Sequence, residues 1–414
     1  MRTKISDISI IICAAISILL TGCVTEPDGV EPAITQNPPG YQIRVLLDDK
    51  AEKISFKIDD EYQIVSCDTA ETLKAAETSK EIELVIDSNT IKMGQQRFNT
   101  RRLVIQPQNG QPFVINHNQK YRGELEIIVN PDNKTLTVIN NVLMEAYLAG
   151  VVASEMPSYW EAEALKVQAI AARTYCLYIK SKFGKNRSWD VKATQANQVY
   201  RGVRAETVRT NDAINSTAGS VLCCEQESGC EPFGTYYSSV CGGHTENSEN
   251  VFGDKFEPLK GVDCPYCRES TKSSLFYWPD VKLDKKIVNK NILERYPSLK
   301  ELGTINKIEV VKESKYNGNL TRITNVKLVG STGKTGFLRA EDLRLAIDSS
   351  GTKLQSTCCA IVSLEKEFLF VAGKGFGHGV GLCQYGAREM ARQGKTAEQI
   401  LSFYYPGSKI KIIY

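Results

Sequence analysis

The stretch from Asn141 to Gly184, NVLMEAYLAGVVASEMPSYWEAEALKVQAIAARTYCLYIKSKFG, predicts two helices that meet at a corner. Apolar residues at helical spacing from Val142 to Val151 give the first helix its buried face. Pro157 has no backbone N–H and disfavours helical geometry at the residue before it. We therefore expect the first helix to end near Ser154–Glu155, which places the Glu155 carboxylate at the break between the helices.

The second helix is expected to open with a capping box, because Ser158 stands three residues before Glu161. Apolar residues then recur at three- and four-residue steps as far as Ile179, and Gly184 is a natural stop. Two rigid helices would hold Glu155 in a fixed place, which a proton-transferring group needs. On spacing alone, however, a solvated surface glutamate is the more common meaning of such a residue.

Two motifs resemble those of one known family. VVASEMP (151–157) and EALKVQAIAARTY (163–175) are similar to the core motif of the stage II sporulation protein D and amidase-enhancer family. GKGFGHGVGLCQYGA (373–387) resembles its second signature and follows in the family's order. The resemblance covers 141–270 and 365–414 and implies that family's domain there.

The resemblance implies that Glu155 is the general acid and base of a peptidoglycan lytic transglycosylase. Such an enzyme cleaves the MurNAc–GlcNAc bonds of glycan strands, notably strands stripped of stem peptides, and leaves 1,6-anhydroMurNAc ends. Glycoside hydrolysis usually needs two carboxylates. Glu161 and Glu163 are better interpreted as a helix cap and a surface charge, so the motifs offer only one catalytic carboxylate, which agrees with a transglycosylase. The alternative from another class is a non-enzymatic glycan-binding protein that enhances a cell-wall amidase.

The same resemblance suggests residues that bind the substrate, and for each of them packing is the alternative role. QANQVY (195–200) is similar to the family's Q-x-Y segment, and the second signature adds polar and aromatic groups. The candidates are Arg173, Gln198, Tyr200, His378, Gln384 and Tyr385. The alternating glycines of GKGFGHGVG fit neither a dinucleotide nor a phosphate loop, but they suit a backbone against which an extended ligand lies.

Cysteine and histidine recur in a pattern typical of a structural zinc site. Cys241-Gly-Gly-His244 and Cys264-Pro-Tyr-Cys267 form two ligand pairs, C-x₂-H and C-x₂-C. Some family members that are similar here carry a metal. Four protein ligands would fill the coordination shell, so we expect the zinc to be structural. Disulfide bonding is the alternative, although it leaves His244 without a role.

The N-terminus predicts export with a lipid anchor. A basic start and an apolar run from Ile8 to Leu20 are typical of a signal peptide. Leu20-Thr21-Gly22-Cys23 resembles a bacterial lipobox, so residues 1–22 would be removed and Cys23 lipidated; an ordinary signal peptide is the alternative. We expect a protein of the cell envelope, exposed on its periplasmic or extracellular side, whose partners are glycan strands and an amidase.

The remaining cysteines predict disulfides without fixing their pairing. Of thirteen cysteines, Cys13 belongs to the signal peptide and Cys23 to the anchor, which leaves eleven (13 − 2). An odd number means that at least one thiol is outside an internal disulfide. Besides the proposed ligands, the candidates for pairing near the motifs are Cys223, Cys224, Cys230, Cys358, Cys359 and Cys383.

Composition and patterning together predict an α+β protein of several parts. Residues 23–40 are rich in proline and polar groups and read as a tether. Short alternating runs from 41 to 140 predict a β-rich domain. The family domain is expected over 141–414, with 270–350 as an inserted lobe. A net charge of +3 offers no field suited to nucleic acid, and three histidines without a nucleophile elbow disfavour a serine or cysteine hydrolase.

Overall fold

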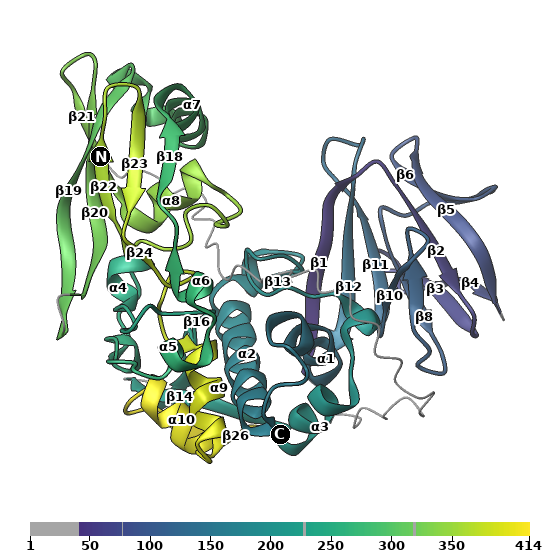
Figure 1. The fold of residues 1–414 in the computed structure, drawn as a ribbon. Helices are drawn as coiled ribbons and strands as arrows, with labels where there is room; N and C mark the ends of the chain where they lie inside the picture. Colours follow the sequence, from purple (N-terminus) through teal and green to yellow (C-terminus); the bar gives the residue numbers. More distant parts are fainter. Residues whose placement is uncertain (1–40, 77, 227–228, 318–319) are drawn as a thin grey trace. The chain divides into compact units, whose positions relative to one another are not determined.

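The computed structural model describes residues 41–414 except 77, 227–228 and 318–319 (Figure 1). The predicted signal peptide, the tether and Cys23 lie outside the described residues. The described chain forms two compact units. The Glu155 unit comprises residues up to Trp160 together with Gln168–Val221 and Lys411–Tyr414, and the cysteine unit comprises Glu161–Val167 and Leu222–Ile410.

Two sheets make up most of the Glu155 unit. The seven-stranded sheet has the order β13-β1-β12-β11-β8-β3-β4, and the six-stranded sheet has the order β10-β9-β2-β5-β6-β7. Their strands are β1 (Gln42–Ala51), β2 (Lys53–Ile58), β3 (Tyr62–Ser66), β4 (Thr72–Ala76), β5 (Ser79–Asp87), β6 (Thr90–Met93), β7 (Gln96–Phe98), β8 (Arg102–Pro107), β9 (Phe113–Ile115), β10 (Gln119–Tyr121), β11 (Glu124–Val129), β12 (Leu136–Leu143) and β13 (Val191–Lys192).

Alternating side chains of these strands form a core between the two sheets. In β8, Leu103 and Ile105 are buried while the residue between them is half-buried, because successive side chains of a strand point to opposite faces. The ring of Phe56 on β2 meets the ring of Tyr62 on β3 edge to face, with 6.1 Å between centroids. The two sheets therefore pack face to face.

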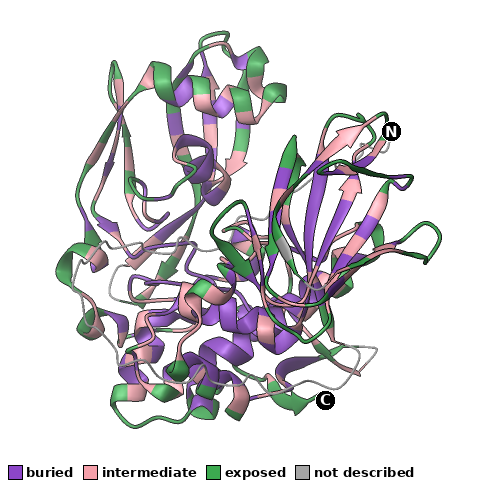
Figure 2. Ribbon diagram, turned by 90° about the vertical axis from the view of Figure 1, so that its right-hand side faces the viewer, coloured by how far each residue is buried: buried purple, intermediate pink, exposed green. Residues whose placement is uncertain are grey.

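Three α-helices occur among the described residues of the Glu155 unit: α1 (Met144–Glu155), α2 (Ala162–Phe183), whose first turns belong to the cysteine unit, and α3 (Val208–Ser216). The predicted end of the first helix is confirmed, since α1 ends at Glu155. Its predicted start is wrong: Val142 and Leu143 finish strand β12, where they pair with β1. The apolar positions of α2 are buried, among them Ala169, Ala172 and Cys176. Figure 2 colours the ribbon by burial, with buried residues in purple.

The predicted capping box does not start the second helix. Glu161 takes the N-cap position, because its carbonyl accepts hydrogen bonds from the N–H groups of Ala164 and Leu165. Ser158 lies earlier, in a turn that the Trp160 N–H closes by donating to the Pro157 carbonyl at 3.1 Å. Residues 156–161 thus form a structured connection between α1 and α2 rather than the first turn of α2.

The cysteine unit contains short strands and helices, the second motif and a larger lobe. Its elements are β15 (Gly229–Pro232), β16 (Tyr237–Ser238), α4 (Ser248–Val251), α5 (Cys267–Ser270), α6 (Ser273–Phe276), β17 (Tyr277–Trp278), β18 (Val281–Asp284), α7 (Lys285–Arg295), β19 (Ile305–Tyr316), β20 (Leu320–Gly330), β21 (Thr335–Arg339), α8 (Ala340–Ile347), β22 (Ala360–Ser363), β23 (Glu367–Val371), β24 (Gly373–Lys374), β25 (Leu382–Cys383), α9 (Gln384–Arg392) and α10 (Ala397–Tyr404). Strands β14 (Ser220–Gln226) and β26 (Lys409–Ile412) have residues in both units.

The lobe, residues 278–370, has a hydrophobic core of its own. The sheets β19-β20-β21 and β18-β23-β22 contribute to it together with α7 and α8. Ile292, Leu328 and Phe368 are each fully buried in this core. The described residues thus form an α+β fold, as predicted, and none of their helices is both long and apolar enough to cross a membrane.

Candidate active site and metal centre

Glu155 is a buried carboxylate at the C-terminal end of α1. Only 8% of the residue is exposed. Its Oε1 accepts a hydrogen bond of 2.9 Å from the backbone N–H of Val199. The helix ends here because the next residue, Met156, adopts extended backbone geometry before Pro157. Sequence and fold therefore place one carboxyl group at a fixed point.

The surroundings of Glu155 raise its pKa to about 7, chiefly through burial. The Val199 N–H and the positive charge of Arg201 act in the opposite direction. A helix C-terminus carries partial negative charge, which also disfavours a carboxylate. A pKa near neutrality allows one group to donate a proton and take one back at similar cost.

Gln198 supports the segment that contacts Glu155. Its side chain is fully buried; its Oε1 accepts a hydrogen bond of 3.0 Å from the Tyr147 hydroxyl, and its Nε2 donates one of 3.2 Å to the Ala172 carbonyl. These bonds fix residue 198 and hence the adjacent Val199 N–H. In this position Gln198 packs within the unit, which was the alternative to its predicted contact with substrate.

Tyr200 is also used for packing. The residue is 4% exposed, and its hydroxyl donates to the Asn140 side chain at 2.8 Å. Its ring lies against Gly150 of α1, where a Cβ atom would come within 2.5 Å of the ring. The close approach of helix and ring therefore requires glycine at position 150.

Arg173 forms a buried ion pair that joins α2 to α1. Its guanidinium donates to both carboxylate oxygens of Glu145, at 2.8 and 2.5 Å, and to the Ser220 carbonyl at 3.0 Å. The side chains are 0% and 1% exposed. Tyr414 also donates to Glu145. The guanidinium is thus engaged by the protein itself, and the structure gives no support to the substrate contact predicted for Arg173.

His378, in the second motif, is buried in the cysteine unit. Its ring nitrogens face the Tyr237 carbonyl at 2.9 Å and the Val380 N–H at 3.0 Å, which suits a neutral ring that donates through Nε2 and accepts through Nδ1. Burial lowers the pKa of His378 to about 4. Packing thus accounts for His378.

The next two candidates lie at the start of α9. Gln384 begins this helix and is buried, and the Tyr385 N–H donates to the Ser239 carbonyl.

The alternating glycines of the second motif make room for the protein rather than for a ligand. Gly375, Gly377, Gly379 and Gly381 all have positive φ, between 70° and 100°. A Cβ atom would lie 2.7 Å from the Val240 carbonyl at the first of them and 2.1 Å from the Tyr236 carbonyl at the last. At these four positions, the expectation that an extended ligand uses the space is wrong.

Four buried thiols gather in the cysteine unit. Cys241, Cys264, Cys267 and Cys383 are all buried, and their sulfur atoms lie within 4.8 Å of one another. The sulfurs of Cys241 and Cys267 are 3.7 Å apart. Tetrahedral zinc with bonds of about 2.3 Å holds its sulfurs about 3.8 Å apart. The donor set and spacing therefore fit a zinc ion with four thiolate ligands.

This group differs from the predicted ligand set in one member. The His244 ring stacks on Tyr316, with 3.7 Å between centroids, and its Nδ1 lies against the Thr245 carbonyl. Cys383, from the second motif, completes the group instead. The C-x₂-H spacing with Cys241 favours the histidine as a ligand, whereas local spacing gives no sign of Cys383. The GLCQYGA motif itself was the available signal.

One disulfide occurs among the described cysteines. Cys223 of β14 is bonded to Cys230 of β15 across a hairpin. Both cysteines are among those that the sequence predicted to form disulfides, although it did not predict which cysteines pair with each other. Cys224, next to it, is free and buried.

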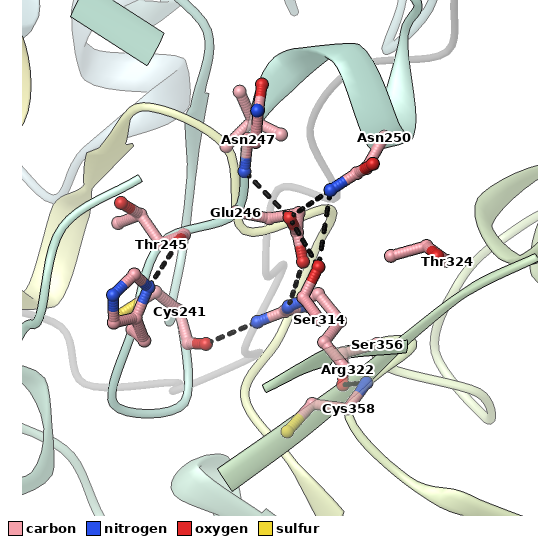
Figure 3. Close-up of polar contacts among 12 residues, drawn as sticks. Cys241, Thr245, Glu246, Asn247, Asn250, Ser314, Arg322, Thr324, Ser356 and Cys358 are labelled. Atoms are coloured by element: carbon pink, nitrogen blue, oxygen red, sulfur yellow. Dashed lines mark hydrogen bonds and ion pairs between the residues drawn. The ribbon is translucent and has the colours of Figure 1, made fainter. Parts of the chain in front are cut away.

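A polar network that sequence did not predict joins the lobe to the segment from Cys241 to Asn250 (Figure 3). Glu246 Oε1 accepts hydrogen bonds from the Asn247 backbone N–H, the Asn250 amide and the Ser314 hydroxyl, at 2.8 to 3.0 Å. Arg322 of β20 donates to the Cys241 carbonyl at 2.5 Å. Arg322 and Glu246 are each 1% exposed and 3.9 Å apart. The lobe thereby positions a residue of the thiol cluster.

Comparisons with known proteins agree with the two motifs. A family model described as Stage II sporulation protein matches residues 132–223, which include Glu155 and its Val199 partner. The chain is 31% identical over 288 residues to stage II sporulation protein D of Bacillus subtilis, covering 66% of this chain and 75% of that protein.

Two further relatives extend this picture. An uncharacterized protein of Brachyspira hyodysenteriae is 30% identical over 368 residues, covering 89% of this chain and 92% of that protein. The amidase enhancer of Bacillus subtilis is 27% identical over 299 residues, covering 64% of this chain and 40% of that protein. Given the identity and coverage of these relatives, the chain belongs to the stage II sporulation protein D family.

Proposed function

We propose that this protein works on the bacterial cell wall and cleaves peptidoglycan glycan strands as a lytic transglycosylase. The observation that carries the proposal is the buried Glu155 carboxyl, whose pKa is raised to about 7 at the end of α1. The names of the sporulation and amidase-enhancer relatives support a role at the wall. Their alignments do not by themselves specify a reaction.

In the proposed reaction Glu155 transfers one proton in each direction. The protonated carboxyl donates to the glycosidic oxygen as the bond from MurNAc C1 to that oxygen breaks. The resulting carboxylate then takes the proton of the same sugar's 6-hydroxyl, whose oxygen forms the new bond to C1. The products are a 1,6-anhydroMurNAc end and a GlcNAc end with a free hydroxyl. General acid–base help of this kind contributes about 10²- to 10⁴-fold in rate.

The alternative function is a glycan-binding protein without catalysis that stimulates a cell-wall amidase. The specific observation in its favour is the similarity to an amidase enhancer. It predicts that strand binding and amidase stimulation persist when the carboxyl group of Glu155 is removed.

Glu155→Gln tests the two functions against each other. The amide keeps an oxygen to accept the Val199 N–H but cannot transfer the proton. Incubation of both proteins with intact and peptide-free glycan strands, followed by mass spectrometry, should give anhydro ends only with the parent protein. Absence of anhydro products from the folded parent, with strands still bound, would reject the enzyme in favour of the binding protein.

We also infer a structural zinc ion held by Cys241, Cys264, Cys267 and Cys383. The support is the buried, closely spaced set of four thiols, none of which is in a disulfide. Zinc with four protein ligands has no open position for a substrate. Its role here would be to hold the turn at Cys241, the start of α5 and the start of α9 together.

Export with a lipid anchor at Cys23 is proposed on the sequence of residues 1–23. A substrate in the cell wall requires a location outside the cytoplasm. The Cys223–Cys230 disulfide supports the same compartment, because disulfides persist in oxidising environments. Radiolabelled palmitate should label the parent protein expressed in a bacterium, but not Cys23→Ser.

A further inference from the structure

Tyr159 is an exposed aromatic residue close in sequence to Glu155 and in the same unit. It lies in the connection between α1 and α2. The residue is 70% exposed, and no other large apolar residue among those described is more exposed. Its neighbours Met156 and Trp160 are each only 1% exposed. The connection is thus anchored near both ends while the Tyr159 side chain faces outward.

The backbone on both sides of Tyr159 is held by one arginine. Arg209, in the first turn of α3, donates through Nε to the Ser158 carbonyl at 2.9 Å and through Nη2 to the Trp160 carbonyl at 2.7 Å. The turn from Pro157 to Trp160 adds a backbone hydrogen bond. Arg209 and the turn therefore both hold the backbone that carries the exposed ring. This lowers the conformational entropy lost when a ligand packs on the ring.

The chemistry of such a ring selects a particular class of ligand. A pyranose sugar presents one face of C–H groups and a rim of hydroxyls. The flat apolar face of tyrosine complements the C–H face, and its hydroxyl can bond to the rim. A ring that carries no charge is a poor site for a metal ion or a phosphate.

We propose that Tyr159 forms a sugar-binding subsite beside Glu155, where its ring stacks on a pyranose of the glycan strand, and that Arg209 positions it. The proposal rests on the proposed function for the identity of the strand. It extends that function, because neither the motifs nor the predicted substrate-binding residues include Tyr159 or Arg209.

Binding without cleavage tests the subsite separately from catalysis. In a Glu155→Gln background, the affinity for peptide-free glycan strands is measured by titration calorimetry for Tyr159→Ala, Tyr159→Phe and Phe337→Ala. Phe337 is a matched control, an aromatic residue of the lobe that is 64% exposed. We expect Tyr159→Ala to weaken binding about tenfold, while Tyr159→Phe and the control bind nearly as well as the background protein.

A double-mutant cycle identifies the role of Arg209. If the arginine acts by positioning the ring, Arg209→Ala weakens binding when Tyr159 is present and has no further effect in Tyr159→Ala. In the catalytically competent protein, Tyr159→Ala should raise KM much more than it lowers kcat.

Each measurement supports or overturns one part of the proposal. Equal binding by Tyr159→Ala and its background overturns the subsite, and so does a failure of the background protein to bind strands at all. Additive effects of Arg209 and Tyr159 overturn the positioning role. If strands bind through Tyr159 but the parent protein leaves no anhydro ends, the transglycosylase proposal fails while the subsite stands.

Discussion

Glu155 links the proposed chemistry to the stability of the protein. Burial raises its pKa from an ordinary value of 4.5 to about 7, so the folded protein favours the protonated form. Between these pH values the folded state binds more protons than the unfolded state. The contribution of Glu155 to the free energy of unfolding is therefore fully present below about pH 4.5. It declines as the pH rises through the folded-state pKa of about 7.

The first prediction follows from that sign. Glu155→Gln should be more stable than the parent at pH 8, by about 3 kcal/mol, because the amide avoids the cost of a buried charge. At pH 4 the two proteins should have nearly the same stability. Urea unfolding at both pH values measures the difference. A gap that is as large at pH 4 as at pH 8 would contradict the raised pKa.

A second prediction concerns the contact between Gly150 and Tyr200. Gly150→Ala places a methyl group within 2.5 Å of the ring, so the helix or the ring must move. We expect a loss of about 1–3 kcal/mol in unfolding free energy, as for overpacked cores. Because Val199 precedes Tyr200, cleavage of glycan strands should fall as well.

Thermal unfolding and product analysis check this second prediction. Tyr200→Phe is the comparison, because it removes the hydroxyl that bonds to Asn140 but adds no volume. An unchanged melting temperature for Gly150→Ala would show that the ring can move without cost.

Helices α1 and α2 are joined by the buried pair of Glu145 and Arg173. Arg173→Met should cost about 3–5 kcal/mol, because it leaves the Glu145 carboxylate buried without its cation. The matched control is the pair of Arg122 and Glu206, which also has two hydrogen bonds of 2.8 Å but side chains 22% and 11% exposed. Arg122→Met should cost much less. Equal losses in denaturant unfolding would reject the argument from burial.

The thiol cluster joins the turn at Cys241 to α5 and α9, and its ligand set can be tested directly. After purification, metal analysis by mass spectrometry should find zinc in the parent and in His244→Ala. It should find much less in Cys383→Ser. Cys176→Ser is the control, since Cys176 is a buried thiol of α2 in the other unit.

The opposite pattern would favour the set predicted from sequence. Zinc lost from His244→Ala but kept by Cys383→Ser would mean that the histidine is a ligand. Absence of zinc from the parent, purified without chelators, would reject the site altogether. In either case the structural role given to the cluster would have to be withdrawn.

For the molecule as a whole, sequence predicted what depends on local rules. The end of α1 at Glu155, two residues before Pro157, follows from the proline's missing N–H, and the β-rich character of residues 41–140 follows from alternation. The α+β class followed from both. Short strands such as β7 cannot be predicted one by one, because three residues carry too little periodicity to be recognised.

What sequence could not predict depends on contacts between distant residues. Nothing local to Gln198 reveals that its amide is buried between α1 and α2, and the spacing of Cys241 and His244 favoured a fourth member other than Cys383. Arg322 carries no motif, yet it binds the Cys241 carbonyl from within the lobe. The candidate carboxylate was found in advance because the motif resemblance singled it out.

The lobe also separates the thiols in the order in which the chain is made. Cys241, Cys264 and Cys267 leave the ribosome first, and the whole of the lobe follows before Cys383 emerges. During that interval the first three thiols lack the fourth member of the cluster. They are then exposed to oxidation and to pairing with the wrong partner. A redox chaperone or a supply of metal would matter most in this window of biosynthesis.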